Sequence, residues 1–352
     1  HPPLSEHADP CAAAPSRSTA PSRSTALSRS TALGRAQRWP GRGGSMSAWI
    51  VPYVDQELAF WQDVHARFGD QIQEVYFPLP GGQFASGRAP QPEQFLDSFL
   101  RHAPLPKAAV VNPIVLDRPV EQVAPDVIAR LRRLRDEVGL RGVTVTNLAL
   151  AGRIKEALPD LAVAASVLMG IGSPAQALVA RGSLDALGPD TRLARDLRGL
   201  ERLRAAFPGE IRLLVNEACL PGCLFRSQHF YEMAYGRAFP ESLCRQVLEE
   251  RPWLRLTGAW ILPRHLHFYD GLYDSLKLAG RVTLRDPERY LGVLDAYVHR
   301  RPILPRDIGG GPASPLDGID VSDEWFEFVL TCDKRCDTCL VCRQEWHRAC
   351  SS

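Results

Sequence analysis

Two groups of cysteines are the residues of this sequence best suited to chemistry. The first group is Cys219 and Cys223, spaced C-x3-C, with Cys244 further along the chain. The second lies in the C-terminal run CDKRCDTCLVCRQEWHRAC, with cysteines at Cys332, Cys336, Cys339, Cys342 and Cys350. Thiolates are soft ligands that select zinc, copper(I) or iron–sulfur clusters. Because a short loop lets two sulfurs reach one metal at little entropic cost, both groups are candidate ligand sets.

The two groups differ in how well packing alone explains them. Four cysteines between residues 332 and 342 are hard to explain as core packing, so they predict a zinc site or a 4Fe-4S cluster. For Cys219, Cys223 and Cys244 the alternative is a set of buried, inert thiols. Disulfides are disfavoured, because no secretory signal is visible and a cytoplasmic, reducing compartment is expected. Arg226 stands where a radical-SAM motif needs a third cysteine.

Composition limits the class of protein. The chain has 352 residues, 45% of them apolar, which is enough for one large domain with a core. Its formal charge of +2 leaves no electrostatic footprint for nucleic acid, so no DNA partner is expected. No uncharged apolar run is long enough for a membrane span.

The first 45 residues differ in composition from the rest of the chain. The sequence SRSTA recurs at Ser16, Ser22 and Ser28 in a segment poor in large apolar groups. Such a segment cannot offset its ordering entropy, so residues 1–45 are predicted to be a disordered tail. We interpret it as non-native translation upstream of a start at Met46, with a transit peptide as the alternative. The expected domains are a barrel over 46–305 and a linker with a Cys-rich segment over 306–352.

From Met46 onward, short apolar runs alternate with helical patterns. Several runs are continuous enough for parallel strands buried on both faces. Strands are expected at 48–52, 74–78, 108–114, 142–148, 162–169, 212–216, 256–262 and 275–278, with helices at 123–138 and 195–207. This alternation predicts an α/β fold of the TIM-like (β/α)8 barrel type, with a doubly wound open sheet as the alternative. The catalytic rim of a barrel lies just past its strands, where the sequence places Asn112, Asn147, Asn216, Glu217 and Cys219.

Three features taken together resemble a known family. They are the segment LVNEAC…GC…R…HF, the later Cys244, and the run LPRHLHFYDGLYDSLKLAGR at 262–281. This order resembles the collagenase-like peptidase family, unknown-type peptidase family thirty-two. The matching elements span residues 212–290, and the barrel pattern extends the likeness over 46–301.

The resemblance implies a (β/α)8-like barrel, possibly incomplete in its closure, with an oxygen-sensitive 4Fe-4S cluster at its rim. Despite the family name, several members resemble oxygen-independent hydroxylation proteins that act on ubiquinone precursors or RNA bases. This short chain looks nearest to the single-domain ubiquinone type, UbiU and UbiV. The implied function is an iron–sulfur hydroxylase or a hydroxylase subunit. The alternatives are a metal-dependent peptidase and a non-catalytic iron–sulfur partner in a heterodimer with a related member.

Carried over residue by residue, the resemblance places Cys219, Cys223 and Cys244 on the first three cluster ligands. The fourth position departs from the family pattern, because the Pro-Lys-Asp-Leu-Cys-like loop of the family reads PRHLH here and ends in His267. Three alternatives remain open for it. His267 is the fourth ligand, a tail cysteine completes the site, or the tail holds a second centre of its own, with zinc as the alternative metal.

Further candidates surround these cysteines. His229 and Glu217 are predicted catalytic groups, since imidazole titrates near neutrality and Glu217 follows a strand. A small anionic substrate would suit guanidinium and ammonium groups. The predicted substrate-binding residues are Arg281, Arg226, Lys277 and Asn216. Lys277 and Arg281 are expected on one strand and on the same face of it.

Overall fold

The computed structural model describes residues 48–80, 93–220, 222–234, 237, 242–281, 283–304, 307–308, 320–336 and 338–350. All of them lie in one compact unit of the chain. The expected tail over residues 1–45 and most of the expected linker lie outside the described residues. Among the described helices, none combines the length and the apolar character needed to span a bilayer.

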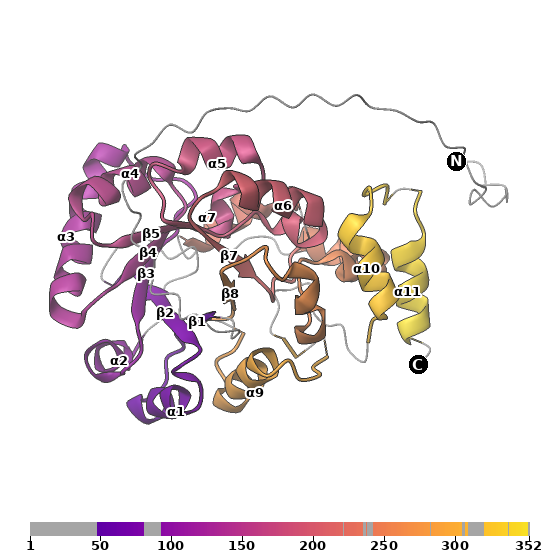
Figure 1. The fold of residues 1–352 in the computed structure, drawn as a ribbon, viewed down its shortest axis with the longest axis horizontal. Helices are drawn as coiled ribbons and strands as arrows, with labels where there is room; N and C mark the ends of the chain where they lie inside the picture. The colour runs from indigo at the N-terminus through magenta and orange to yellow at the C-terminus, as the bar shows by residue number, and fades with distance from the viewer. Residues whose placement is uncertain are drawn as a thin grey trace. The chain divides into compact units, whose positions relative to one another are not determined.

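Eight parallel strands form a closed barrel in sequence order (Figure 1). They are β1 (Ala48–Pro52), β2 (Ile72–Pro78), β3 (Lys107–Val111), β4 (Gly142–Val145), β5 (Ala162–Ala165), β6 (Ala186–Leu187), β7 (Glu210–Leu214) and β8 (Ser275–Lys277). The first and last strands close the ring, with Trp49 opposite Leu276 and Ile50 opposite Lys277. The expected TIM-like barrel is therefore confirmed, and it is closed rather than incomplete.

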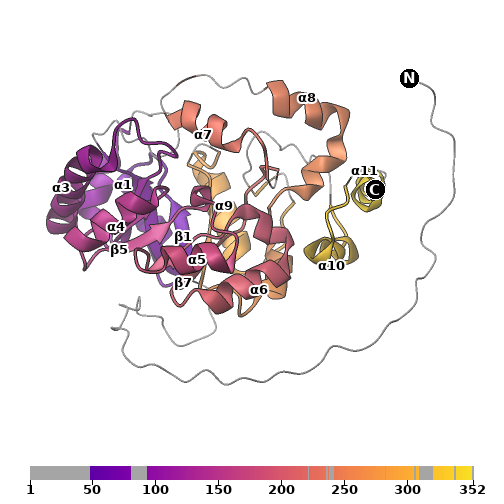
Figure 2. The same cartoon turned by 90° about the horizontal axis from the view of Figure 1, so that it is seen from above.

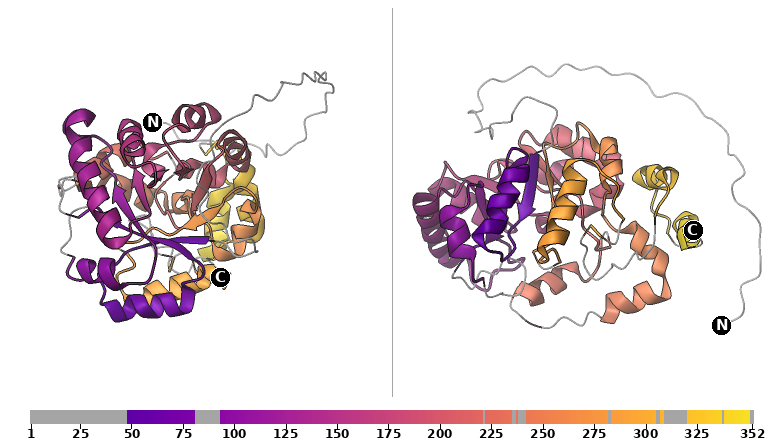
Figure 3. Two further views of the ribbon diagram at one scale, coloured as in Figure 1. Left: turned by 60° about the vertical axis from the view of Figure 1, so that its left-hand side comes forward. Right: turned by 90° about the horizontal axis from the view of Figure 1, so that it is seen from below.

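Helices follow the strands on the outside of the barrel. They are α1 (Leu58–Phe68), α2 (Leu96–His102), α3 (Val120–Val138), α4 (Leu148–Ala157), α5 (Pro174–Ala180), α6 (Leu197–Ala206), α7 (Arg226–Ala234), α8 (Ser242–Glu250) and α9 (Pro287–Val298). Figure 3 shows α1 and α9 side by side where the ring closes. The rings of Phe60 and Tyr290 meet there, with centroids 5.4 Å apart.

Local sequence signals explain where two expected helices begin and end. The helix expected at 123–138 runs from Val120 to Val138 and stops at Gly139, whose φ of 69° is left-handed. The stretch expected as one helix at 195–207 is divided in two. A 3-10 turn, η2 (Thr191–Arg195), ends at Asp196, whose carboxylate then accepts a hydrogen bond from Gly199 N and caps α6.

Two strand assignments need correction. The two-residue β6 was missed, because a run this short has no detectable periodicity. The strand expected at 256–262 is wrong: the chain there leaves the turn η3 (Pro252–Thr257) and makes only an isolated antiparallel bridge from Trp260 to Asn216. Leu256, Ile261 and Leu262 are fully buried. An apolar run reports burial, and burial does not require strand geometry.

The C-terminal segment adds two helices outside the barrel. They are α10 (Asp323–Thr331) and α11 (Val341–Cys350), which lie side by side (Figure 2). Helix α10 packs on η2 and α6, and α11 packs on η3. A second turn, η4 (Pro263–Tyr269), contacts α10 through the stacked rings of His265 and Phe326, whose centroids are 3.8 Å apart. The tail cysteines are thereby held beside the barrel.

Strand side chains alternate between the helix layer and the barrel interior. Trp49, Val51 and Phe77 belong to the large core under the helices, whereas Ile50 and Tyr76 belong to a small separate cluster inside the ring. The interior also contains charge. Arg212 on β7 and Glu74 on β2 are 3% and 0% exposed at the side chain, and Nη1 lies 2.8 Å from Oε1.

This buried ion pair predicts a large effect on stability. We expect Arg212→Leu to lower the free energy of unfolding by about 3–5 kcal/mol, because Glu74 would keep a buried charge without its partner. Arg133→Ala removes the exposed pair with Glu137 and should cost less than about 1 kcal/mol. Urea unfolding of both variants measures the two values. An equal loss of unfolding free energy in the two variants would contradict the conclusion that the buried pair contributes more to stability than the exposed pair.

Candidate functional site

The ends of β7 and β8 are joined by one side chain at the carboxyl-terminal rim. Asn216 is 1% exposed. Its Oδ1 accepts from Ala279 N at 2.7 Å, and its Nδ2 donates to the carbonyl oxygens of Ala279 at 2.8 Å and Ile308 at 3.0 Å. The amide thus holds the backbone of the rim, and its predicted contact with substrate stays a prediction.

The turn that carries Cys219 is held by a carboxylate. Glu217 Oε1 accepts a hydrogen bond from Cys219 N at 2.9 Å. Its Oε2 lies 3.8 Å from Nη2 of Arg226, which also donates to Thr191 Oγ1 in η2. Two of the predicted site residues are therefore neighbours and pair with each other. Their roles toward a substrate stay predictions.

Two of the three rim cysteines meet in space. The thiol of Cys223, which precedes α7, lies near enough to the thiol of Cys244 in α8 to affect its protonation. The pKa of Cys244 is raised above its ordinary value, first by burial and then by the charge and hydrogen bond of Cys223. This contact brings together two residues that the resemblance places on one cluster.

The tail cysteines form a second group between α10 and α11. Burial raises the pKa of Cys342 to about 11, and the charges of the neighbouring thiols act in the same direction. Those neighbours are Cys332, Cys336 and Cys339. These three thiols therefore lie within electrostatic reach of Cys342. Whether a tail cysteine completes the rim site or the tail holds a centre of its own stays a prediction.

Neither group is drawn together at metal-binding distance. Among the described residues, no three His, Cys, Asp or Glu side chains converge closely enough to hold a metal ion. The donor chemistry of both groups fits a soft metal or a cluster. Binding by either group therefore requires its thiols to move toward a common centre.

The predicted histidines lie on α7 and η4. His229 is partly buried on α7, with its ring 5.7 Å from that of Phe230. His267 Nδ1 lies 2.7 Å from the carbonyl oxygen of Arg264, and its ring lies 4.1 Å from that of Phe268. Both of these His267 contacts stay within η4, so its role as a fourth ligand stays a prediction.

The mouth of the barrel holds a lysine in an unusual environment. Lys277 Nζ lies 4.3 Å from the ring centroid of Tyr76. Burial lowers the pKa of Lys277 to about 8, and the cations Arg212 and Arg281 act in the same direction. The amine therefore titrates close to neutrality, as a proton donor or acceptor in a site requires.

A carboxyl group near the mouth is shifted in the opposite direction. Burial raises the pKa of Glu93 to about 7, while Arg281 opposes the shift. Arg281 therefore acts on both Lys277 and Glu93. The prediction that Lys277 and Arg281 share one strand and one face of it is wrong. Strand β8 ends at Lys277, and the chain turns at Gly280, where φ is 141°. Glu93 was not predicted from the sequence, because it does not follow a strand. Tyr76 was not predicted either, although the alternation of side chains along β2 places it inside the barrel.

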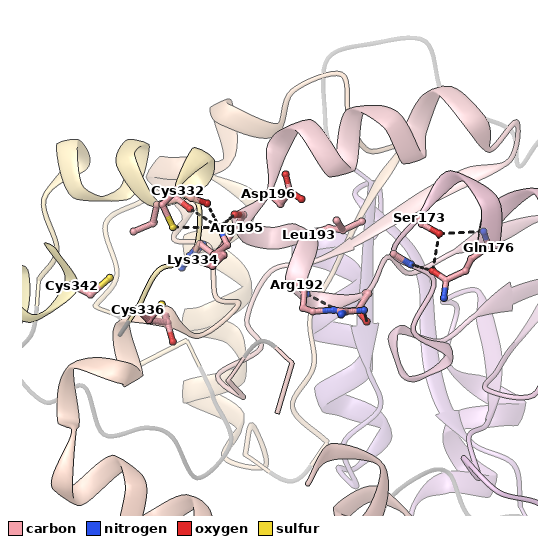
Figure 4. Close-up of a pocket in the computed structure, with 14 residues that line it drawn as sticks. Ser173, Gln176, Arg192, Leu193, Arg195, Asp196, Cys332, Lys334, Cys336 and Cys342 are labelled. Atoms are coloured by element: carbon pink, nitrogen blue, oxygen red, sulfur yellow. Dashed lines mark hydrogen bonds and ion pairs between the residues drawn. The ribbon is translucent and has the colours of Figure 1, made fainter. Parts of the chain in front are cut away.

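A pocket of about 510 Å³ lies between the rim loops and the tail. Figure 4 shows Ser173 and Gln176 on one side and Cys332, Lys334 and Arg195 on the other. Cys336 and Cys342 also line it, as does Arg192. The three polar barrel-side residues Ser173, Gln176 and Arg192 were not predicted from the sequence, because they follow short strands and carry no motif.

The geometry defines a closed (β/α)8 barrel with thiols on the turn after β7. No family profile matches the chain. An uncharacterized protease of Methanocaldococcus jannaschii is 25% identical over 172 residues, which are 44% of this chain and 50% of that protein. The match thus spans about half the length of the relative. It supports the resemblance to the collagenase-like peptidase family, and the ubiquinone-type subgroup stays a prediction.

Solved structures are matched at low sequence identity. A U32 peptidase is 16% identical with a TM-score of 0.46, covering 67% of this chain and 93% of that chain. Phosphoribosyl anthranilate isomerase from Thermus thermophilus is 15% identical with a TM-score of 0.38, covering 72% of this chain and 97% of that chain.

The environment of Lys277 predicts its titration. In the folded state the pKa is lowered, so the folded chain releases the proton near pH 8 while the unfolded chain keeps it to higher pH. Stability should therefore rise with pH above about 8, and Lys277→Met should remove that rise. The extent of acylation of each lysine is measured across a pH series by peptide mapping. The chain has only four lysines, so the peptide with Lys277 is identified directly, and ion-paired Lys155 is the internal reference. A labelling midpoint for Lys277 above about pH 10 would contradict the buried environment.

Proposed function

We propose that this protein is an iron–sulfur protein of the oxygen-independent hydroxylase type, either an enzyme or a hydroxylase subunit. The observation that carries the proposal is the contact between the thiols of Cys223 and Cys244. These cysteines come from the turn before α7 and from α8, and with Cys219 they are the residues that the family resemblance places on a rim cluster. The donor chemistry of three thiols suits a 4Fe-4S cluster.

Such a cluster, when bound, supplies one-electron chemistry at the rim. The residues of the chain itself position it. Glu217 holds the backbone at Cys219 through a 2.9 Å hydrogen bond, and Arg226 fixes the carboxylate of Glu217. Asn216 joins this turn to the end of β8. The cysteine turn is therefore tied to the strand that bears Lys277.

The barrel mouth is the proposed site for a small anionic substrate. Arg281 offers a guanidinium that pairs with a carboxylate in two parallel hydrogen bonds. Lys277, with its pKa near 8, can donate or accept a proton at Nζ beside that substrate. The small, nearly balanced charge of the chain supports a small molecule of the ubiquinone-precursor type over an RNA substrate.

Peptidase activity is a second candidate, favoured by the name of the archaeal relative, an uncharacterized protease. Cleavage of casein by a metal-replete preparation free of other proteases would support it. A heterodimer with a related family member is a third arrangement. Turnover that begins only when such a member is added would support a partner role for this chain.

Loss of rim thiols should lower the iron content. We expect Cys219→Ala and Cys223→Ala each to reduce bound iron by about four atoms per chain, the content of one 4Fe-4S cluster. Iron and acid-labile sulfide are quantified after anaerobic reconstitution of the full chain. Cys350→Ala, an exposed cysteine on α11, is the matched control and should keep its iron. Full iron content in both rim variants would show that the rim holds no cluster.

A further inference from the structure

Arg195 is a buried cation without a carboxylate partner in the described part of the chain. It ends η2 and is 3% exposed. Its guanidinium carbon lies 5.0 Å from the ring centroid of Trp260 and 4.6 Å from that of Phe326. One Nη donates to Trp260 O at 2.6 Å and the other to Ala194 O at 3.3 Å, while Nε has no hydrogen-bond partner.

A comparison within the same barrel shows what Arg195 lacks. Arg212 is equally buried, but its guanidinium meets Glu74 at 2.8 Å and Glu210 at 2.9 Å. Those carboxylates raise the pKa of Arg212, whereas burial lowers that of Arg195. A buried charge is costly unless an anion compensates it. The acidic groups that favour the charge on Arg195 are Tyr269 and two tail thiols, Cys342 and Cys332.

The loop that carries these thiols brings a second cation to the same place. Lys334 adopts a left-handed backbone with φ of 64°. Its Nζ donates to Arg195 O, to Cys332 O at 3.1 Å and to Cys332 Sγ at 3.4 Å. Figure 4 shows Lys334, Cys332 and Arg195 together at one end of the pocket. Two positive groups therefore lie beside Cys332, and the charge of Cys342 also acts on Arg195.

We propose that Cys332, Cys336, Cys339 and Cys342 bind one tetrathiolate metal centre and that Arg195 is its buried counter-cation. Four thiolates around Zn²⁺, or around an oxidised 4Fe-4S core, carry a net charge of −2. Arg195 and Lys334 supply +2 and balance it. Without such a centre, Arg195 has no carboxylate partner among the described residues. The centre stabilises the buried cation, and the cation stabilises the centre.

The pocket explains how a metal reaches these thiols. Cys332, Cys336 and Cys342 line its wall, so three of the four ligands open onto the same 510 Å³ space. This second site is independent of the rim cluster. It uses other cysteines, another helix pair and another cation.

The experiment compares metal-free and metal-loaded forms of the full chain. The variants are the fourfold Cys→Ser change at 332, 336, 339 and 342, then Arg195→Met, Arg195→Lys and Arg192→Met. Arg192 lines the same pocket, but its side chain is 60% exposed and paired with Asp190, so it is the matched control. Each protein is loaded anaerobically with zinc alone or with iron and sulfide. Metal per chain, competition with a chelator of known affinity, and the melting temperature of both forms are measured.

The fourfold variant should lose one equivalent of zinc or one cluster and keep any metal at the rim. Arg195→Met should weaken metal affinity by about 10–100-fold, the usual effect of losing a group that supports metal ligands. Its metal-free form should melt no lower than the wild type, because a buried uncompensated charge has been removed. Arg195→Lys should retain more affinity than Arg195→Met, and Arg192→Met should match the wild type.

Three results would overturn the proposal. Unchanged metal content in the fourfold variant would exclude the tail centre and leave the rim cluster unaffected. Wild-type affinity in Arg195→Met, with metal still lost in the fourfold variant, would exclude the role of Arg195. Equal destabilisation of the metal-free and loaded forms by Arg195→Met would show that the guanidinium only fills the space between two rings.

Discussion

The backbone pairing of β1 with β8 is the constraint on which the rest of the molecule depends. It closes eight parallel strands into a ring, so every carboxyl end faces the same rim. Within that ring β7 pairs directly with β8, so the turn after β7 and the end of β8 lie side by side, and the amide of Asn216 can join them. Val215 N therefore donates to the carbonyl oxygen of Lys277 at 3.0 Å, although the two residues are far apart in the chain.

Three buried cations show how the barrel handles charge in a medium of low polarity. Arg212 keeps its charge because two carboxylates share the interior with it. In the part of the chain that the structure describes, Lys277 has no close ion pair of this kind, and burial lowers its pKa to about 8. Arg195 cannot deprotonate in practice, and it lies between aromatic rings next to thiols. The first cation serves stability, the second suits proton transfer, and the third is placed for an anionic metal centre.

The cysteines divide into two sets with different supports. The rim set stands on turns at the end of β7 and on α8, and a carboxylate holds its first member in place. The tail set stands between two helices that pack against η2, η3 and α6, outside the ring. This division bears on the choice left open by the sequence. A second centre in the tail and a tail cysteine that completes the rim site both stay predictions.

The sequence by itself determined the class of fold and the identity of the chemical groups. Strand and helix periodicity is a local property, and the spacing of cysteines is visible in the letters, so the barrel, most of its strands and both thiol groups could be predicted. Only the tertiary structure decided which groups meet. The contact of Cys223 with Cys244, the shifted carboxyl of Glu93 and the unpaired burial of Arg195 depend on segments brought together across the chain. The apolar run at 256–262 makes the same point, since a pattern of burial does not specify the backbone that achieves it.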